Sequence, residues 1–270
     1  MQIMYSQRSI YWPAYTWKVQ TSYASSIKGK LSNEFKISEA DFEKIYFDIF
    51  DKINASFYHL ERLKENEEIA IKIGTELEKV HMPGTEGMVG IVASPYEPIG
   101  YEYESFLVTS KSTLDFIAIL IAKGFGRAED NIISLLNEVQ SANYTLGSLE
   151  EKVCKLLQNN KFSALFLEYR NIDKDQKSKR NYATHKGSLP IGTINIPINN
   201  PKGVLLRSKA LNPNSPIQHS NILNSQNLVE YCQDQFYQIC DLLIETLSLI
   251  TCSLIKSGPK SSVYQQSRSS

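Results

Sequence analysis

The segment that decides the fold reads Leu114-Asp115-Phe116-Ile117-Ala118-Ile119-Leu120-Ile121. On a helix its apolar side chains point to every side, so we expect this helix to lie at the centre of a bundle. It is predicted to begin near Phe106 or Ser112 and to end at Gly124. Asp115, the one charged residue of the segment, has two interpretations. Either it forms an N-cap box with Ser112, or it is a buried carboxylate near a functional site.

Helical patterns flank this segment on both sides. Apolar residues recur at spacings of three and four from Phe42 to Leu60, after a capping box formed by Ser38 and Asp41. The remaining helices are expected over 38–64, 69–80, 129–140, 148–158, 161–186 (with or without a break) and 225–256. The predicted fold class is therefore mainly α, an up-and-down helical bundle.

Several segments depart from the helical pattern. Gly and Pro residues over 81–104 predict an inserted loop or hairpin, and partial alternation over 190–210 around an Asn-Pro-Gly-containing turn predicts a small β-hairpin. The chain is thus expected to form one helical domain over 38–256. An aromatic-rich N-terminal extension, 1–37, is expected to pack on its core, and the Ser-rich tail 257–270 is expected to be disordered.

Composition excludes several classes of protein. The 270 residues carry 29 basic and 29 acidic side chains, so the chain is not uniformly basic as many non-specific nucleic-acid binders are. Its four cysteines form no C-x-x-C pair, and we expect no disulfide framework, no metal and no other cofactor. No signal-peptide layout or membrane-spanning run is recognised, which favours the cytoplasm. The short motifs of nucleotide-binding loops, zinc proteases and serine hydrolases are absent from the sequence.

One polar stretch, Arg180-Asn181-Tyr182-Ala183-Thr184-His185, carries the strongest chemical signal. An arginine can hold a phosphate with two parallel hydrogen bonds, and a histidine can transfer protons near neutral pH. Together they form a candidate metal-free site for cleaving a phosphodiester. The nearby side chains that are candidates for binding RNA are Arg170, Lys177, Lys179, Tyr182 and Lys186.

The R-N-x-x-x-H pattern resembles the motif of the HEPN superfamily, R-x4–6-H, and the order of helices over 38–256 is similar as well. The resemblance implies a helical bundle with the motif on a late helix, and a metal-independent endoribonuclease that leaves 2′,3′-cyclic phosphate and 5′-hydroxyl ends. It implies RNA as the substrate, a homodimer with the two motifs facing each other, and a toxin–antitoxin or phage-defence role with an antitoxin or other protein as partner. The insertion and the hairpin leave the subfamily open.

Helical geometry bears on how the motif would work. On one ideal helix Asn181 and His185 share a face, whereas Arg180 lies about 140° from His185 around the axis. In a site formed across a dimer the two motifs face each other, so one helix does not have to place Arg180 and His185 side by side. Two alternatives stay open. In the first, the chain is a catalytically inactive HEPN-like module that binds RNA, a nucleotide or a protein. In the second, it is a helical scaffold in which Arg180 and His185 only lie near a helix C-terminus, where positive charge is favoured.

Overall fold

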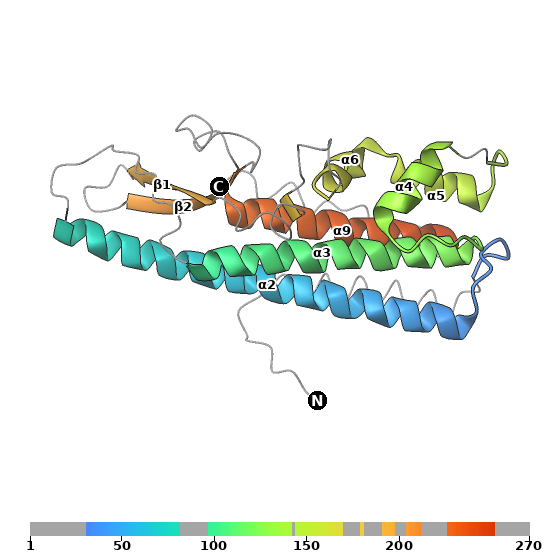
Figure 1. Ribbon diagram of the computed structural model, residues 1–270, viewed down its shortest axis with the longest axis horizontal. Coiled ribbons are helices and arrows are strands. Elements are labelled where there is room, and N and C mark those ends of the chain that lie inside the picture. The colour runs from blue at the N-terminus through green and yellow to red at the C-terminus, as the bar shows by residue number, and fades with distance from the viewer. Residues whose placement is uncertain are drawn as a thin grey trace, which may run out of the picture.

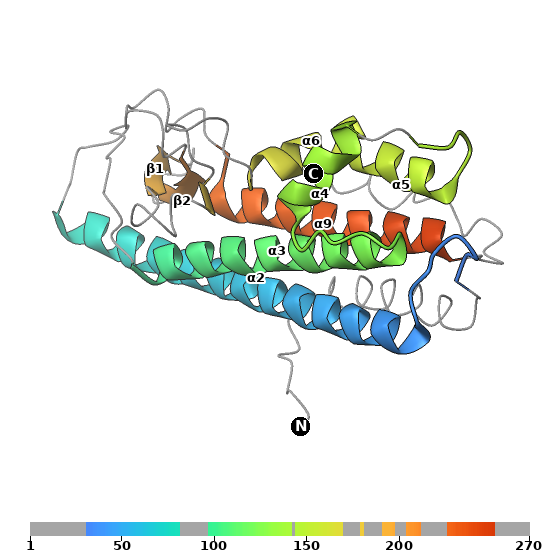
Figure 2. The same ribbon diagram turned by 45° about the vertical axis from the view of Figure 1, so that its right-hand side comes forward.

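The computed structural model describes residues 31–81, 97–141, 144–169, 179–180, 191–197, 204–211 and 226–251. Three long helices lie side by side in this part of the chain (Figure 1): α2 (Glu39–His81), α3 (Glu97–Gly124) and α9 (Leu228–Ile250). α3 runs antiparallel to α2, and α9 runs in the direction of α3, as the rotated view in Figure 2 also shows. The prediction of a mainly α, bundle-like fold is confirmed.

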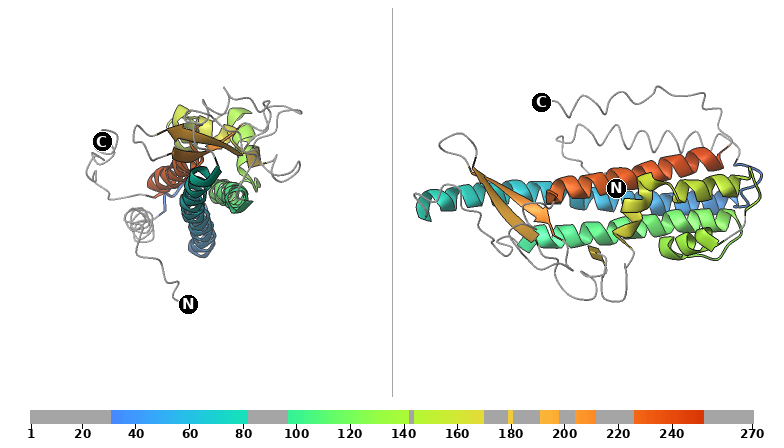
Figure 3. Two further views of the ribbon diagram at one scale, coloured as in Figure 1. Left: turned by 90° about the vertical axis from the view of Figure 1, so that its left-hand side faces the viewer. Right: turned by 90° about the horizontal axis from the view of Figure 1, so that it is seen from above.

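The shorter elements cover one side of the bundle. Near one end, α4 (Ile132–Ser141) packs on α3, while α5 (Leu149–Leu157) and α6 (Asn160–Leu167) pack on α9. Near the other end, strands β1 (Ile191–Pro197) and β2 (Val204–Ala210) pair antiparallel where the sequence predicted a hairpin. The hairpin lies against α2 and α9, as the view from above in Figure 3 shows.

Helix α2 is one continuous helix of 43 residues, which corrects the expectation of two stretches over 38–64 and 69–80. Its start agrees with the sequence, because Ser38 Oγ accepts a hydrogen bond from the backbone N–H of Asp41 (3.1 Å). The charge cluster over 61–68 does not interrupt the helix. Ion pairs at spacing i, i+3, Glu61 with Lys64 and Arg62 with Glu65, lie along its surface and are compatible with the helical backbone.

Helix α3 begins at Glu97, well before the predicted start near Phe106 or Ser112. The last part of the predicted insertion, 97–104, is therefore helical, and 82–96 lies outside the described residues. The early start follows from burial, because Tyr103 and Phe106 are wholly inside the bundle. The central position of α3 agrees with the sequence prediction. Leu114, Ile117 and Leu120 are fully buried against their neighbours.

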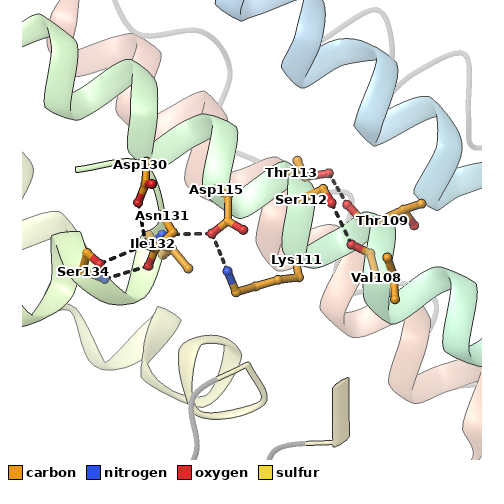
Figure 4. Close-up of polar contacts among 10 residues, drawn as sticks. All are labelled: Val108, Thr109, Lys111, Ser112, Thr113, Asp115, Asp130, Asn131, Ile132 and Ser134. Carbon is orange, nitrogen blue, oxygen red and sulfur yellow. Dashed lines mark hydrogen bonds and ion pairs between the residues drawn. The ribbon is translucent and has the colours of Figure 1, made fainter. Parts of the chain in front are cut away.

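Asp115 does not form the N-cap box with Ser112, and its side chain is 26% exposed, so it is not a buried carboxylate. It lies in the middle of α3, so it cannot cap that helix, and Ser112 Oγ instead donates to the carbonyl of Val108 (3.0 Å). Its Oδ1 accepts a hydrogen bond from the backbone N–H of Ile132 (3.0 Å), the first residue of α4, and forms an ion pair with Lys111 (Figure 4). Asp115 therefore caps the neighbouring helix across the interface.

Arg127, just after α3, ties the short helices to the bundle. Its guanidinium pairs with Glu138 of α4 and with Glu150 of α5, where Nη2 lies 2.6 Å from Oε1. The guanidinium also lies 5.8 Å from the centre of the Tyr144 ring. One arginine thus fixes the position of both helices that follow α3.

The chain ends of the bundle lie close together. Leu31 bridges to Thr251, which follows α9, and Ser32 donates a backbone hydrogen bond to Ile250 (3.0 Å). α9 is shorter than the 225–256 predicted, and the tail 257–270 lies outside the described residues. Among the described helices, Pro98–Gly124 is long and apolar enough to cross a membrane, but 56% of its most apolar window is buried. A central helix of a soluble bundle has the same properties.

Candidate functional site

Two of the predicted site residues, Lys179 and Arg180, belong to the part of the chain that the structure describes. They form a short piece of helix. The other predicted catalytic and RNA-binding residues lie outside the described residues: Arg170, Lys177, Asn181, Tyr182, His185 and Lys186. The structure also ends α6 at Leu167, so the helix predicted from residue 161 is interrupted before the motif.

Lys179 is bound to the bundle by two different helical regions. Its Nζ lies 3.0 Å from Oε2 of Glu168, the residue that follows α6. The same Nζ lies 4.1 Å from the centre of the Tyr231 ring on α9. The Tyr231 hydroxyl donates to Oε2 of Glu168 (2.6 Å), which closes the triangle. We call Glu168, Lys179 and Tyr231 the clasp.

The clasp is largely shielded from water. The side chain of Lys179 is 14% exposed and that of Glu168 is 26% exposed. Tyr231 is buried. An ammonium in this position gains from both the carboxylate and the electron-rich ring face, and both contacts are stronger when water is excluded. The positive charge of Lys179 is therefore offset by the protein's own groups, and its main structural effect is to hold the backbone at Arg180.

Beneath the clasp lies a cluster of buried tyrosines from three parts of the chain. The rings of Tyr103 on α3 and Tyr231 on α9 pack edge to face, with centres 6.2 Å apart. Burial raises the pKa of Tyr103, Tyr169 and Tyr231, and the negative charge of Glu168 raises each of these pKa values further. Burial also raises the pKa of the neighbouring Cys232 thiol. These groups stay neutral at physiological pH, so the clasp lies on a buried, uncharged base.

Arg180 is half-buried and follows Lys179 directly in the same short helix. Its backbone is therefore fixed by the clasp one residue away. A catalytic side chain needs support of this kind, because a site that is loose by about 1 Å loses much of its activity. The described residues contain no group of three or more His, Cys, Asp or Glu side chains that could hold a metal ion.

A second titratable pair lies between α2 and α3. His59 Nδ1 is 2.7 Å from Oε2 of Glu102, and Arg62 Nε is 3.9 Å from Oε1 of the same carboxylate. These contacts link α2 and α3 at Glu102. His59 is expected to contribute to the packing of α2 against α3. A substitution of His59 can therefore serve as a control for a substitution of His185 in the motif.

Sequence reasoning missed Glu168 and Tyr231. Tyr231 belongs to the apolar stripe of the last helix and Glu168 follows a short apolar helix, so neither stands out as a partner of the motif. The two residues are separated by 63 positions along the chain. No local pattern connects them, and the contact depends on how α6 packs on α9.

Comparisons of the chain with protein-family models, with curated proteins and with solved structures found no match, so its function is inferred from its own residues and contacts.

Proposed function

We propose that this protein is a metal-independent endoribonuclease of HEPN type, with Arg180, Asn181 and His185 as its catalytic residues. The observation that carries the proposal is the clasp, which anchors the first residue of the R-N-x-x-x-H motif to the bundle through Lys179, Glu168 and Tyr231. A fixed backbone at Arg180 is what a catalytic arginine requires, and this supports the proposal. The mainly helical architecture also agrees with the resemblance.

The chemistry follows from the side chains of the motif. The 2′-hydroxyl of the RNA attacks the adjacent phosphorus, and its proton passes to a base. The bond from phosphorus to the 5′-oxygen breaks, and that oxygen takes up a proton. His185 transfers one of these protons, while Arg180 holds the scissile phosphate and offsets the negative charge that builds on it. Asn181 orients His185 or hydrogen-bonds the phosphate. The products are a 2′,3′-cyclic phosphate and a 5′-hydroxyl.

The remaining basic side chains of this region would bind the RNA backbone. Arg170, Lys177 and Lys186 are proposed phosphate contacts, and Tyr182 is a proposed stacking residue. Lys179 has a different role in this proposal, because its ammonium is already bound by Glu168. Two motifs facing each other across a homodimer would complete the composite site.

The role of Arg180 can be tested by its own substitutions. Purified wild-type protein, Arg180→Ala and Arg180→Lys are incubated with RNA in excess EDTA. Loss of a phosphate-holding arginine should lower the cleavage rate by about 10²–10³-fold, and lysine should restore only a small part because it lacks the bidentate fork. Equal cleavage by all three proteins would remove Arg180 from the site. Binding of RNA without cleavage by the wild type would favour the inactive binding module.

A further inference from the structure

The chain has a net charge of zero, but positive and negative charge are separated along it. Residues 31–251 carry 22 basic and 29 acidic side chains, a net charge of −7. The segments on either side, 1–30 and 252–270, contain no Asp or Glu and carry a net charge of +7. We call these two segments the basic flanks. Their basic residues are Arg8, Lys18, Lys28, Lys30, Lys256, Lys260 and Arg268.

The structure brings the starting points of the two flanks together. Leu31, which follows the first flank, forms a β-bridge with Thr251, which precedes the second. The backbone N–H of Ser32 donates to the carbonyl of Ile250 (3.0 Å), and the N–H of Thr251 donates to that of Leu247 in α9 (3.1 Å). Both flanks therefore leave the bundle at one place, the C-terminal end of α9, although they are far apart in the sequence. Their positive charges act on the same region of space.

The long helices of the bundle have the opposite charge. Together α2, α3 and α9 carry 19 acidic and eight basic side chains, and the sequence of α9 contains no Lys or Arg. A surface of this sign repels the phosphate backbone of RNA. Positive charge that holds RNA must therefore come from other parts of the chain, and the basic flanks contain seven such residues without an acidic neighbour in the same segment.

The composition of the first flank favours a nucleic acid over other anionic partners. Residues 1–30 contain both tryptophans of the protein, Trp12 and Trp17, and four tyrosines. Aromatic rings that stack on unpaired bases, together with Lys and Arg that neutralise phosphates, bind single-stranded nucleic acids with little sequence preference. The same residues contain no Leu and no Phe, which with Trp form the apolar face of membrane-binding helices.

We propose that the basic flanks form a second RNA-binding element, separate from the R-N-x-x-x-H motif. The choice of RNA as the nucleic acid rests on the proposed function. Tyr231 of the clasp lies 19 residues before Ile250 on α9, a distance of about 29 Å along the helix at 1.5 Å per residue. At about 3.4 Å per stacked nucleotide, one RNA strand needs about nine nucleotides to cover this distance. RNA longer than this can be held by the flanks and the motif together, which raises its affinity over that of shorter RNA.

RNA binding by the full-length chain tests the proposal. All proteins carry His185→Ala, so that the RNA stays intact, and binding is measured in EDTA by fluorescence anisotropy with a labelled single strand of about 30 nucleotides at several salt concentrations. The first-flank variant is Arg8→Gln/Lys18→Gln/Lys28→Gln/Lys30→Gln, and the second-flank variant is Lys256→Gln/Lys260→Gln/Arg268→Gln. The matched control is Lys44→Gln/Lys72→Gln/Lys123→Gln/Lys152→Gln. It changes four exposed lysines of the helices and lowers the net charge as much as the first-flank variant does. Circular dichroism checks that each variant is folded.

The salt dependence of the affinity gives the clearest readout. Each phosphate contact to a single strand contributes about 0.7 to the slope of log affinity against log salt concentration, so the slope should become shallower by about 3 in the first-flank variant and by about 2 in the second. At 0.1 M salt the first-flank variant should bind about 10²-fold more weakly. The control should leave the slope unchanged. RNA should also quench the tryptophan emission of the parent protein, because Trp12 and Trp17 both lie in the first flank.

Three results would overturn the proposal. In the first, neither flank variant changes the affinity or the slope. In the second, the control loses as much affinity as the first-flank variant, so that net charge alone decides binding. In the third, the parent protein binds phosphatidylserine vesicles and no RNA, and the flanks then bind membranes. None of these measurements requires cleavage, so an inactive motif does not affect the test.

Discussion

The Nζ atom of Lys179 lies 3.0 Å from Oε2 of Glu168, and the next residue along the chain is Arg180. Tyr231 binds both partners, through its ring to Lys179 and through its hydroxyl to Glu168. The start of the proposed catalytic motif is therefore attached to two parts of the bundle, α9 and the end of α6. This attachment fixes the position of the backbone where the motif begins.

The clasp should affect turnover more than RNA binding. Lys179→Met removes the ion pair and the cation–π contact but keeps the length of the side chain, and Lys179→Arg keeps the charge. We expect Lys179→Met to lower kcat by about 10²-fold, because small displacements of catalytic groups cost that much, with KM little changed. Lys179→Arg should recover most of kcat. A rise in KM alone would instead indicate that Lys179 binds RNA directly.

Asp115 should stabilise the bundle by capping α4. Asp115→Ala removes the acceptor for the Ile132 N–H and the partner of Lys111. Loss of a helix cap typically costs about 0.5–2 kcal/mol, and we expect a decrease in the free energy of unfolding within this range. Urea unfolding measures it. Asp115→Asn, which keeps an oxygen acceptor, should cost less than Asp115→Ala, and an equal or smaller cost for the alanine variant would contradict the capping role.

The buried tyrosines should make the fold sensitive to alkaline pH. The pKa values of Tyr103, Tyr169 and Tyr231 are raised by burial above the ordinary value of 10.0. The contribution of these neutral phenols to the stability of the fold is complete below pH 10. It is lost as the pH rises above 10, because the unfolded chain releases its phenol protons at a lower pH than the folded protein does. Each should lower the free energy of unfolding by about 1.4 kcal/mol per pH unit in that range. Tyr231→Phe should give a shallower dependence in urea titrations between pH 9 and about 11.

The buried thiols should be inert in the folded protein. Burial raises the pKa of Cys232 and Cys240, and it raises the pKa of Cys154 as well. Because the thiolate is the reactive species, alkylation of these residues should stay slow when the pH rises from 7 to about 9. Mass spectrometry after iodoacetamide treatment gives the rate for each cysteine. Rapid labelling of Cys232 in native protein would show that the base of the clasp opens readily.

Local sequence signals predicted some elements and failed at others for a physical reason. The same Ser-x-x-Asp spacing occurs at Ser38–Asp41 and at Ser112–Asp115. The first caps α2, with Ser38 Oγ accepting from Asp41 N–H. The second lies inside α3, because the buried side chains of Tyr103, Phe106 and Leu107 extend the helix far upstream. A capping pattern therefore does not define a helix start when packing favours a longer helix.

Some residues of the candidate site could be proposed from the sequence, and others could not. The residue types of the motif could be recognised from their spacing along the chain, because Arg180 and His185 are close in sequence. The groups that hold the motif could not, since Glu168 meets Tyr231 across 63 positions. The cap that Asp115 forms on α4, with Ile132 17 positions further along the chain, is a second contact of this kind. These contacts depend on how helices pack, which short sequence patterns do not encode.

The most direct test of the proposed nuclease is cleavage of total RNA in EDTA by the wild type, His185→Ala and the control His59→Asn. His59 pairs with Glu102 between α2 and α3, so its substitution controls for the loss of a histidine elsewhere in the protein. We predict cleavage to 2′,3′-cyclic phosphate ends by the wild type and His59→Asn, with the rate of His185→Ala lower by about 10²–10⁴-fold. Equal cleavage by wild type and His185→Ala, or no cleavage of any RNA by the wild type, would contradict the account.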